Sequence, residues 1–405
     1  MVTRANAADG NRSRDFECVA LLLQGGGALG AYQGGVYQAL AEYDIHPDWV
    51  AGISIGAINA AIIAGNAPEH RVAKLREFWE QVTSNLSWPQ VKDGTSLLVA
   101  GDEARKAFNQ ASAAATLSHG ASGFFAPRLP APWLFPDGSL EATSWYETGP
   151  LRRTLERLVD FDRLNNGETR VSLGAVDIRS GNFAYFDSKS EPIRPDHVLA
   201  SGALPPSFPA VEIDGRHYWD GGLVSNTPLQ WVLQDGPRQD TLAFQVDLWN
   251  ARGDFPRNLS EVATRQKEIN YSSRTRNETD RFKHSQQIRH AVAKLMQQLP
   301  DEMKQCAEGQ LLAEFGDHKV YTLVHLIYRA QHYEGDSKDY EFSRLSMEEH
   351  WRAGHRDTIE TLRHPEALAR PDNGDGISVI DIASRRDDGI ADTQPISVKE
   401  NRHAS

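Results

Sequence analysis

The chain of 405 residues is 40% hydrophobic, which is enough to bury a sizeable core in one large domain with an addition or in two domains. Its net charge of −12 at pH 7 argues against general nucleic-acid binding, which requires a basic face. Its two cysteines are too few for a disulfide framework, and they suit a reducing compartment.

The N-terminal residues 1–16 are polar and predict a disordered arm, without the apolar stretch that is typical of an export signal. The longest uninterrupted apolar run, Cys18–Leu23, is far too short to span a bilayer. We therefore expect a cytoplasmic protein, and peripheral contact with a membrane or lipid surface stays open.

A buried strand over residues 19–23 leads into a glycine-rich loop and then into a helix. Such a loop presents backbone N–H groups at a helix N-terminus, which suits either a phosphate or an oxyanion. Gly25, Gly27 and Gly30 also satisfy the G-x-G-x-x-G dinucleotide fingerprint, which is a weak signal in a chain with 32 glycines. A nucleotide-binding oxidoreductase is therefore an alternative at this point.

The second strand, Trp49–Ile53, meets an apolar helix at Ser54. Gly52 and Gly56 allow the strand and the helix to cross closely, so the G-x-S-x-G spacing predicts a strained turn with an exposed serine hydroxyl. A serine that merely caps the helix is the competing interpretation. The dinucleotide fingerprint requires an acidic residue where this chain has Ser54, and that difference favours an oxyanion over a phosphate.

Helical periodicity returns from Pro68 and is lost between 88 and 148. Within this stretch, residues 123–136 hold four aromatic side chains among four prolines, which predicts neither a helix nor a central strand. We expect exposed aromatic side chains here, in a lid or the wall of an acyl-chain groove, or else in an Ω-loop on the surface.

A helix near 151–159 and a hairpin over 171–186 follow, and then a strand that ends at Asp220. Gly221 and Gly222 come directly after it. This pattern predicts a carboxylate exposed in a cleft, although a solvated aspartate in a turn is the competing interpretation.

The glycine loop, G-x-S-x-G and Asp-Gly-Gly, in this order, resemble the patatin-like phospholipases over roughly residues 17–250. The resemblance implies an α/β fold with a mainly parallel central sheet flanked by helices. It also implies that Ser54 and Asp220 form a catalytic dyad. We expect no cofactor, and no metal, because no cluster of His, Cys and Asp has the spacing of metal ligands. The implied oxyanion donors are Gly25, Gly26 and Gly27. Many members carry Arg or Lys where this chain has Leu29, so substrate preference stays open.

The segment 251–370 resembles the C-terminal α/β extension of a bacterial subset of this family, packed on the first domain. A long helix, a strand near 319–328 and a capping box at Ser346 are predicted within it. Residues 265–294 carry eight Lys or Arg against three Asp or Glu, which indicates either a solvated helix face or a site that docks on anionic lipid. Residues 371–405 are polar and predict a disordered tail.

The sequence thus predicts a serine acyl-ester hydrolase that releases fatty acids from phospholipid or other lipid esters and does not bind nucleic acid. The alternatives are the oxidoreductase above and a non-catalytic lipid-binding module. A Ser-His-Asp hydrolase would also need a histidine late in the chain, and none of the candidates lies in a motif. These candidates are His284, His290, His318, His325, His332 and His350.

Overall fold

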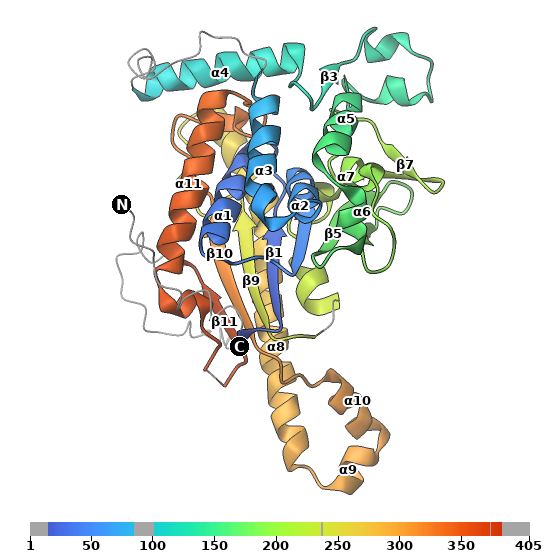
Figure 1. Ribbon diagram of the computed structural model, residues 1–405, viewed down its shortest axis with the longest axis vertical. Helices are drawn as coiled ribbons and strands as arrows, with labels where there is room; N and C mark the ends of the chain where they lie inside the picture. The colour runs from blue at the N-terminus through green and yellow to red at the C-terminus, as the bar shows by residue number, and fades with distance from the viewer. Residues whose placement is uncertain (1–14, 85–100, 236–237, 373, 383–405) are drawn as a thin grey trace, which may run out of the picture.

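The computed structural model describes residues 15–84, 101–235, 238–372 and 374–382 (Figure 1). Its strands are β1 Cys18–Leu23, β2 Trp49–Ile53, β3 Ala126–Pro127, β4 Tyr146–Glu147, β5 Arg170–Asp177, β6 Phe183–Asp187, β7 Val211–Ile213, β8 Arg216–Asp220, β9 Thr241–Asp247, β10 Tyr321–Ile327 and β11 Ile377–Ile380. Its α-helices are α1 Ala31–Glu42, α2 Ile55–Ala64, α3 Pro68–Val82, α4 Asp102–His119, α5 Gly149–Leu158, α6 Phe161–Asn166, α7 Pro195–Ser201, α8 Leu259–Gln298, α9 Asp301–Gln305, α10 Ala307–Phe315 and α11 Arg344–Leu362.

Within these ranges the main sheet has nine strands, in the order β11-β10-β9-β1-β2-β5-β8-β7, with β6 also paired to β5. Every pair from β11 to β5 is parallel, whereas the pairs that involve β6, β7 and β8 are antiparallel. The predicted α/β fold with a mainly parallel sheet is therefore confirmed. Parallel neighbours need helical crossovers, and these place helices on both faces of the sheet.

Strand β1 lies in the middle of the sheet and is buried on both faces, as its continuous apolar sequence predicts. Leu21 and Leu23 pack into the larger cluster with α1 and α2, while Ala20 and Leu22 pack on the opposite side with Phe282 of α8. Figure 1 shows the same division, because α1, α2, α3 and α11 cover one face and α8 passes along the other.

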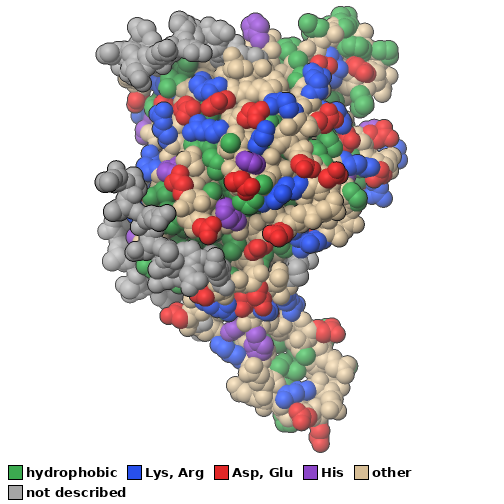
Figure 2. Space-filling view, in the orientation of Figure 1, with side chains coloured by type: hydrophobic (Ala, Val, Ile, Leu, Met, Phe, Trp, Pro, Cys, Tyr) green, Lys and Arg blue, Asp and Glu red, His purple; other side chains and the backbone are tan. Residues whose placement is uncertain are grey.

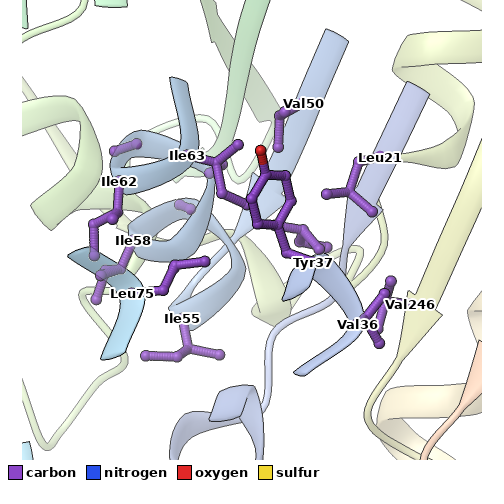
Figure 3. Close-up of a cluster of buried hydrophobic side chains, with 14 of the residues drawn as sticks. Leu21, Val36, Tyr37, Val50, Ile55, Ile58, Ile62, Ile63, Leu75 and Val246 are labelled. Carbon is purple, nitrogen blue, oxygen red and sulfur yellow. The ribbon is translucent and has the colours of Figure 1, made fainter. Parts of the chain in front are cut away.

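Helix α2 is the centre of the larger cluster, and every one of its residues is buried. Figure 3 shows its Ile55, Ile58, Ile62 and Ile63 facing side chains of α1, α3 and the central strands. A helix that is apolar all round belongs in a core. Its N-terminus, and with it Ser54, is therefore fixed by packing along the whole helix.

The C-terminal extension is part of the same sheet, because β10 and β11 continue it beyond β9. Helix α11 also packs closely on α1. A Cβ atom on Gly35 would lie 1.9 Å from the carbonyl oxygen of Trp351, and one on Gly354 would lie 2.0 Å from that of Tyr32. The predicted boundary at 250/251 therefore does not coincide with a break in the sheet or the core.

Three local predictions were wrong. Helix α4 lies between 88 and 148, where the sequence predicts no helical periodicity, and β11 lies in the first part of the predicted disordered tail. Helix α11 begins earlier than its predicted capping box, because Ser343 is the N-cap and accepts a hydrogen bond from the backbone N–H of Ser346. The predicted N-terminal arm falls almost wholly outside the described residues, although Phe16 at its end is buried.

Candidate active site

Ser54 occupies a strained turn between β2 and α2. Its φ of 57° and ψ of −123° are unusual for a residue with a side chain, and this confirms the predicted strain. A Cβ atom on Gly52 would lie 2.2 Å from the carbonyl oxygen of Gly56, and one on Gly56 would lie 2.2 Å from that of Leu23. Both positions therefore require glycine, as the G-x-S-x-G pattern predicts.

Ser201, the last residue of α7, fixes this turn by hydrogen bonding. The backbone N–H of Ser54 donates a hydrogen bond to the Oγ atom of Ser201 (3.1 Å). The Ser201 hydroxyl in turn donates to the carbonyl oxygen of Gly174 (2.6 Å). The Ser201 side chain is fully buried. Sequence reasoning did not assign it a role, because its partners Ser54 and Gly174 are far from it along the chain.

Strand β5 brings Ser54 and Asp220 together. Ile53, the residue before Ser54, pairs with Gly174, and Asp220 pairs with Ala175, the next residue of β5. Two residues that are far apart in sequence therefore meet across one strand. The Ser54 hydroxyl lies close enough to the Asp220 carboxylate to lower the pKa of that group by hydrogen bonding.

Asp220 is only 2% exposed, so the prediction of an exposed carboxylate was wrong, although the residue does line a pocket. Burial raises the pKa of Asp220 to about 6, and the hydrogen bonds from Ser54 and from the backbone N–H of Gly222 act in the opposite direction. The bond from Gly222 is 2.7 Å long. Asp220 is thus a stronger base than a solvated aspartate.

The backbone N–H groups of the glycine loop differ in whether they already have a hydrogen-bond acceptor. That of Gly25 donates to the carbonyl oxygen of Asn226 (3.2 Å). Within the described part of the chain, the N–H groups of Gly26 and Gly27 meet no acceptor. Gly30 has a packing role, since a Cβ atom there would lie 2.5 Å from Ile55. Of the predicted donors, Gly26 and Gly27 are therefore available to an oxyanion.

The C-terminal extension holds this loop through the backbone of Asp339. Its carbonyl oxygen accepts a hydrogen bond from the N–H of Ala28 (2.8 Å) and would lie 2.0 Å from a Cβ atom on Gly27, whose φ is +56°. Lys267 of α8 fixes Asp339 in turn, because its Nζ donates to both carboxylate oxygens, at 2.8 and 3.1 Å. Neither residue was singled out from the sequence, since each contact spans a large separation along the chain.

A pocket of about 370 Å³ opens over Ser54 and Asp220. The extension contributes polar side chains to its lining, and these include Lys267 and Tyr271. The apolar wall consists of Ile55, Ile58, Leu117, Phe124, Phe125, Tyr146, Leu204, Phe208 and Phe342. The volume and the largely apolar lining suit a small hydrophobic ligand or one acyl chain.

The predicted exposed aromatic segment divides into two parts. Phe124 and Phe125 are buried, at 7% and 6% exposure, because they pack against Phe208 and Phe342, so the prediction of their exposure was wrong. They belong to the wall of the pocket. Trp133, by contrast, is 71% exposed.

No histidine lines the pocket in the part of the chain that the structure describes. The Nε2 atom of His350 lies 3.2 Å from the Glu334 carboxylate in a buried pair, and the Nδ1 atom of His325 lies 4.0 Å from Asp247. His290 and His318 lie beside each other, and His284 and His332 are exposed. The six candidate bases are therefore dispersed.

The positive charges of residues 265–294, the basic stretch of α8, are partly neutralised by ion pairs. Arg265 pairs with Glu268, and Lys267 pairs with Asp339. Arg289 lies over the ring of Phe315. The side chains of residues 273–276 lie outside what the structure describes. Docking on anionic lipid stays a prediction.

Neither a metal centre nor a membrane span is found in the described ranges. No three His, Cys, Asp or Glu side chains there come together in a way that could hold a metal ion. Likewise, no helix among these residues is both long and apolar enough to cross a bilayer.

Comparison with known proteins identifies two matching family models. The model of the patatin-like phospholipases matches residues 21–232, and a second model, described as patatin phospholipase, matches residues 269–374. Among solved structures, VipD from Legionella pneumophila is similar at 15% identity and a TM-score of 0.37, covering 86% of this chain and 67% of that one. No curated protein matches the chain.

Proposed function

The chain belongs to the patatin-like phospholipase family, and we propose that it is a serine acyl-ester hydrolase that releases fatty acids from phospholipid or other lipid esters. One observation carries the proposal. A strained serine and a buried aspartate, whose pKa the serine hydroxyl lowers, line the same largely apolar pocket as Gly26 and Gly27, whose backbone N–H groups are free to bind an anion.

In the acylation step, the Oγ atom of Ser54 attacks the ester carbonyl carbon while its proton passes to the Asp220 carboxylate. The carbonyl oxygen becomes negatively charged and accepts hydrogen bonds from the N–H groups of Gly26 and Gly27. When the intermediate collapses, the proton on Asp220 passes to the leaving alcohol oxygen. The products are the free alcohol and an acyl group on Ser54.

In the deacylation step, a water molecule gives its proton to Asp220 and attacks the acyl carbonyl carbon. The same two N–H groups hold the second oxyanion. Collapse returns the proton to Ser54 and releases the fatty acid. The wall formed by Phe124, Phe125 and Phe208 is suited to the acyl chain during both steps.

Labelling with a fluorophosphonate tests the proposal directly. Such a probe reacts with an activated serine, so we expect intact-protein mass spectrometry to show one adduct and peptide mapping to place it on Ser54. The chain offers many other serines as internal controls. An unlabelled folded protein would support a non-catalytic lipid-binding module, and an adduct on another serine would overturn the assignment.

The pH dependence of hydrolysis should report the state of Asp220. Only the carboxylate can accept the serine proton, and the pKa of this group is raised to about 6. We therefore expect kcat/KM for a soluble short-chain ester to rise with pH through about 6 and then to level off. A profile that is flat from pH 5 to pH 8 would contradict this role for Asp220.

A further inference from the structure

Residues 128–145 form an excursion between β3 and β4 that presents large apolar side chains to solvent. Figure 2 shows hydrophobic side chains gathered at this end of the molecule, at the upper right. The residues concerned are Leu129 at 88% exposure, Trp133 at 71%, Leu134 at 67%, Trp145 at 50% and Leu140 at 44%. We call these five residues the apolar patch. Exposed apolar groups gathered in this way usually mark a contact surface.

The base of the excursion is held in place. β3 pairs with β4, and the Arg128 guanidinium donates to Ser144 Oγ (2.9 Å) and to the carbonyl oxygen of Tyr146 (3.3 Å). The rings of Trp133 and Trp145 lie 5.8 Å apart, edge to face. The patch is therefore presented to solvent by a fixed frame.

The same frame is continuous with the pocket. The N–H of Trp145 donates to the carbonyl oxygen of Pro206 (3.1 Å), and that of Tyr146 donates to Ser207 (3.0 Å). Ser207 and Tyr146 both line the pocket, and the Tyr146 hydroxyl donates to the carbonyl oxygen of Leu117, another lining residue. A surface that covered the apolar patch would therefore lie next to the side of the pocket that Leu117, Tyr146 and Phe208 line, which we call its apolar end.

The charges around the patch indicate which surface fits. Arg128 is the only basic residue between 126 and 147, and its guanidinium is occupied within the excursion. Asp137, Glu141 and Glu147 are exposed. An anionic membrane would be repelled by these carboxylates, whereas a surface without net charge would not.

We propose that the apolar patch docks the protein on a lipid surface without net charge, such as a phosphatidylcholine bilayer, with the apolar end of the pocket facing the lipid. Aromatic and aliphatic side chains enter the boundary between head groups and acyl chains, where tryptophan is favoured. The inference rests on the proposed function only for what is hydrolysed there, since docking itself requires no reaction.

Binding to vesicles tests the proposal without hydrolysis. In a Ser54→Ala background, we expect the protein to pellet with phosphatidylcholine vesicles equally well at 0.15 M and 0.5 M NaCl, because charges contribute little. Adding Leu129→Ser, Trp133→Ser and Leu134→Ser should weaken binding at least tenfold. Met303→Ser with Leu311→Ser is the matched control, since both residues are exposed and lie on α9 and α10 at the opposite end of the molecule (Figure 1).

Two outcomes would overturn the proposal. One is equal binding by the patch variant and the control. The other is binding that requires anionic lipid and weakens steeply with salt, which would move docking to the basic stretch of α8. The same three patch substitutions, made with Ser54 intact, should leave hydrolysis of a soluble short-chain ester unchanged. If no ester is hydrolysed while vesicle binding behaves as expected, then the proposed function fails and the docking surface stands.

Discussion

Ser54→Ala and Asp220→Asn are each expected to lower ester hydrolysis by at least about 10³-fold while leaving the protein folded. Alanine removes the nucleophile but keeps the backbone N–H that bonds to Ser201. Asparagine keeps an oxygen that can accept from Gly222, but it cannot take up the serine proton. Steady-state rates on a soluble ester, together with circular dichroism and thermal unfolding of each variant, measure both expectations.

Asp220→Asn carries a further expectation for stability. The pKa of Asp220 is raised in the folded state, so the folded protein binds more protons than the unfolded chain between about pH 4 and pH 6. The free energy of unfolding therefore falls as pH rises through this window, and at pH 7 the buried, charged carboxylate still destabilises the folded state. Because its side chain is uncharged, the Asp220→Asn variant should unfold at pH 7 at a temperature no lower than that of the wild type.

Alanine at each of the six histidines provides the control for the dyad. None of them lines the pocket within the described residues, so each folded variant should keep most of its activity. His350→Ala needs the check of folding most, because it leaves the buried Glu334 carboxylate with only Tyr328 and the backbone N–H of Gln331 as hydrogen-bond donors among the described residues. One folded histidine variant that is as inactive as Ser54→Ala would favour a triad over a dyad.

The elements around Ser54 could be predicted because their signals are local. An apolar strand, two glycines and an apolar helix determine the turn within a dozen residues, and the structure has β2 and α2 at the predicted positions. Strand β1 and the β5–β6 hairpin follow equally local patterns. β1, β2 and α2 are buried along their whole length, as their continuous apolar sequences predict.

Helix α4 could not be recognised in this way because its buried stripe is polar except for one alanine. It consists of Arg105, Asn109, Ser112, Ala113 and Thr116. Once buried, Arg105 is hydrogen-bonded to Glu349 and Ser346, and Ser112 to Glu341. Hydrophobic periodicity detects apolar stripes, so a helix whose burial depends on distant polar partners lacks the signal.

The burial of Phe124 and the occupied N–H of Gly25 were missed for the same reason. The partners of Phe124 include Phe342, far along the chain in the extension, and Gly25 donates to Asn226. Strand β11 is short and lies in a polar stretch, and only pairing with β10 makes it a strand. Sequence patterns describe what a segment prefers, whereas these features are decided by what the fold brings next to it.

Gly27→Ala should lower kcat by about 10²- to 10³-fold, which is the loss seen when one oxyanion donor is removed. A methyl group there would lie 2.0 Å from the carbonyl oxygen of Asp339, so the loop must move and its free N–H must leave its position. Gly181→Ala is the matched control. It places alanine at a similar positive φ, +69° against +56°, with nothing within 4 Å and no part in the site, so it should change stability but not kcat.

Lys267→Met should also lower kcat, but by less than Gly27→Ala does. It removes the side chain that holds Asp339 without adding atoms to the glycine loop. Fluorophosphonate labelling rates should fall in parallel with kcat, since the phosphonyl oxygen occupies the oxyanion position, while KM for a short ester changes little. If Gly27→Ala keeps a third or more of wild-type kcat, then its N–H is not an oxyanion donor. If Gly181→Ala loses as much activity as Gly27→Ala, then the loss reflects backbone strain and not the oxyanion site.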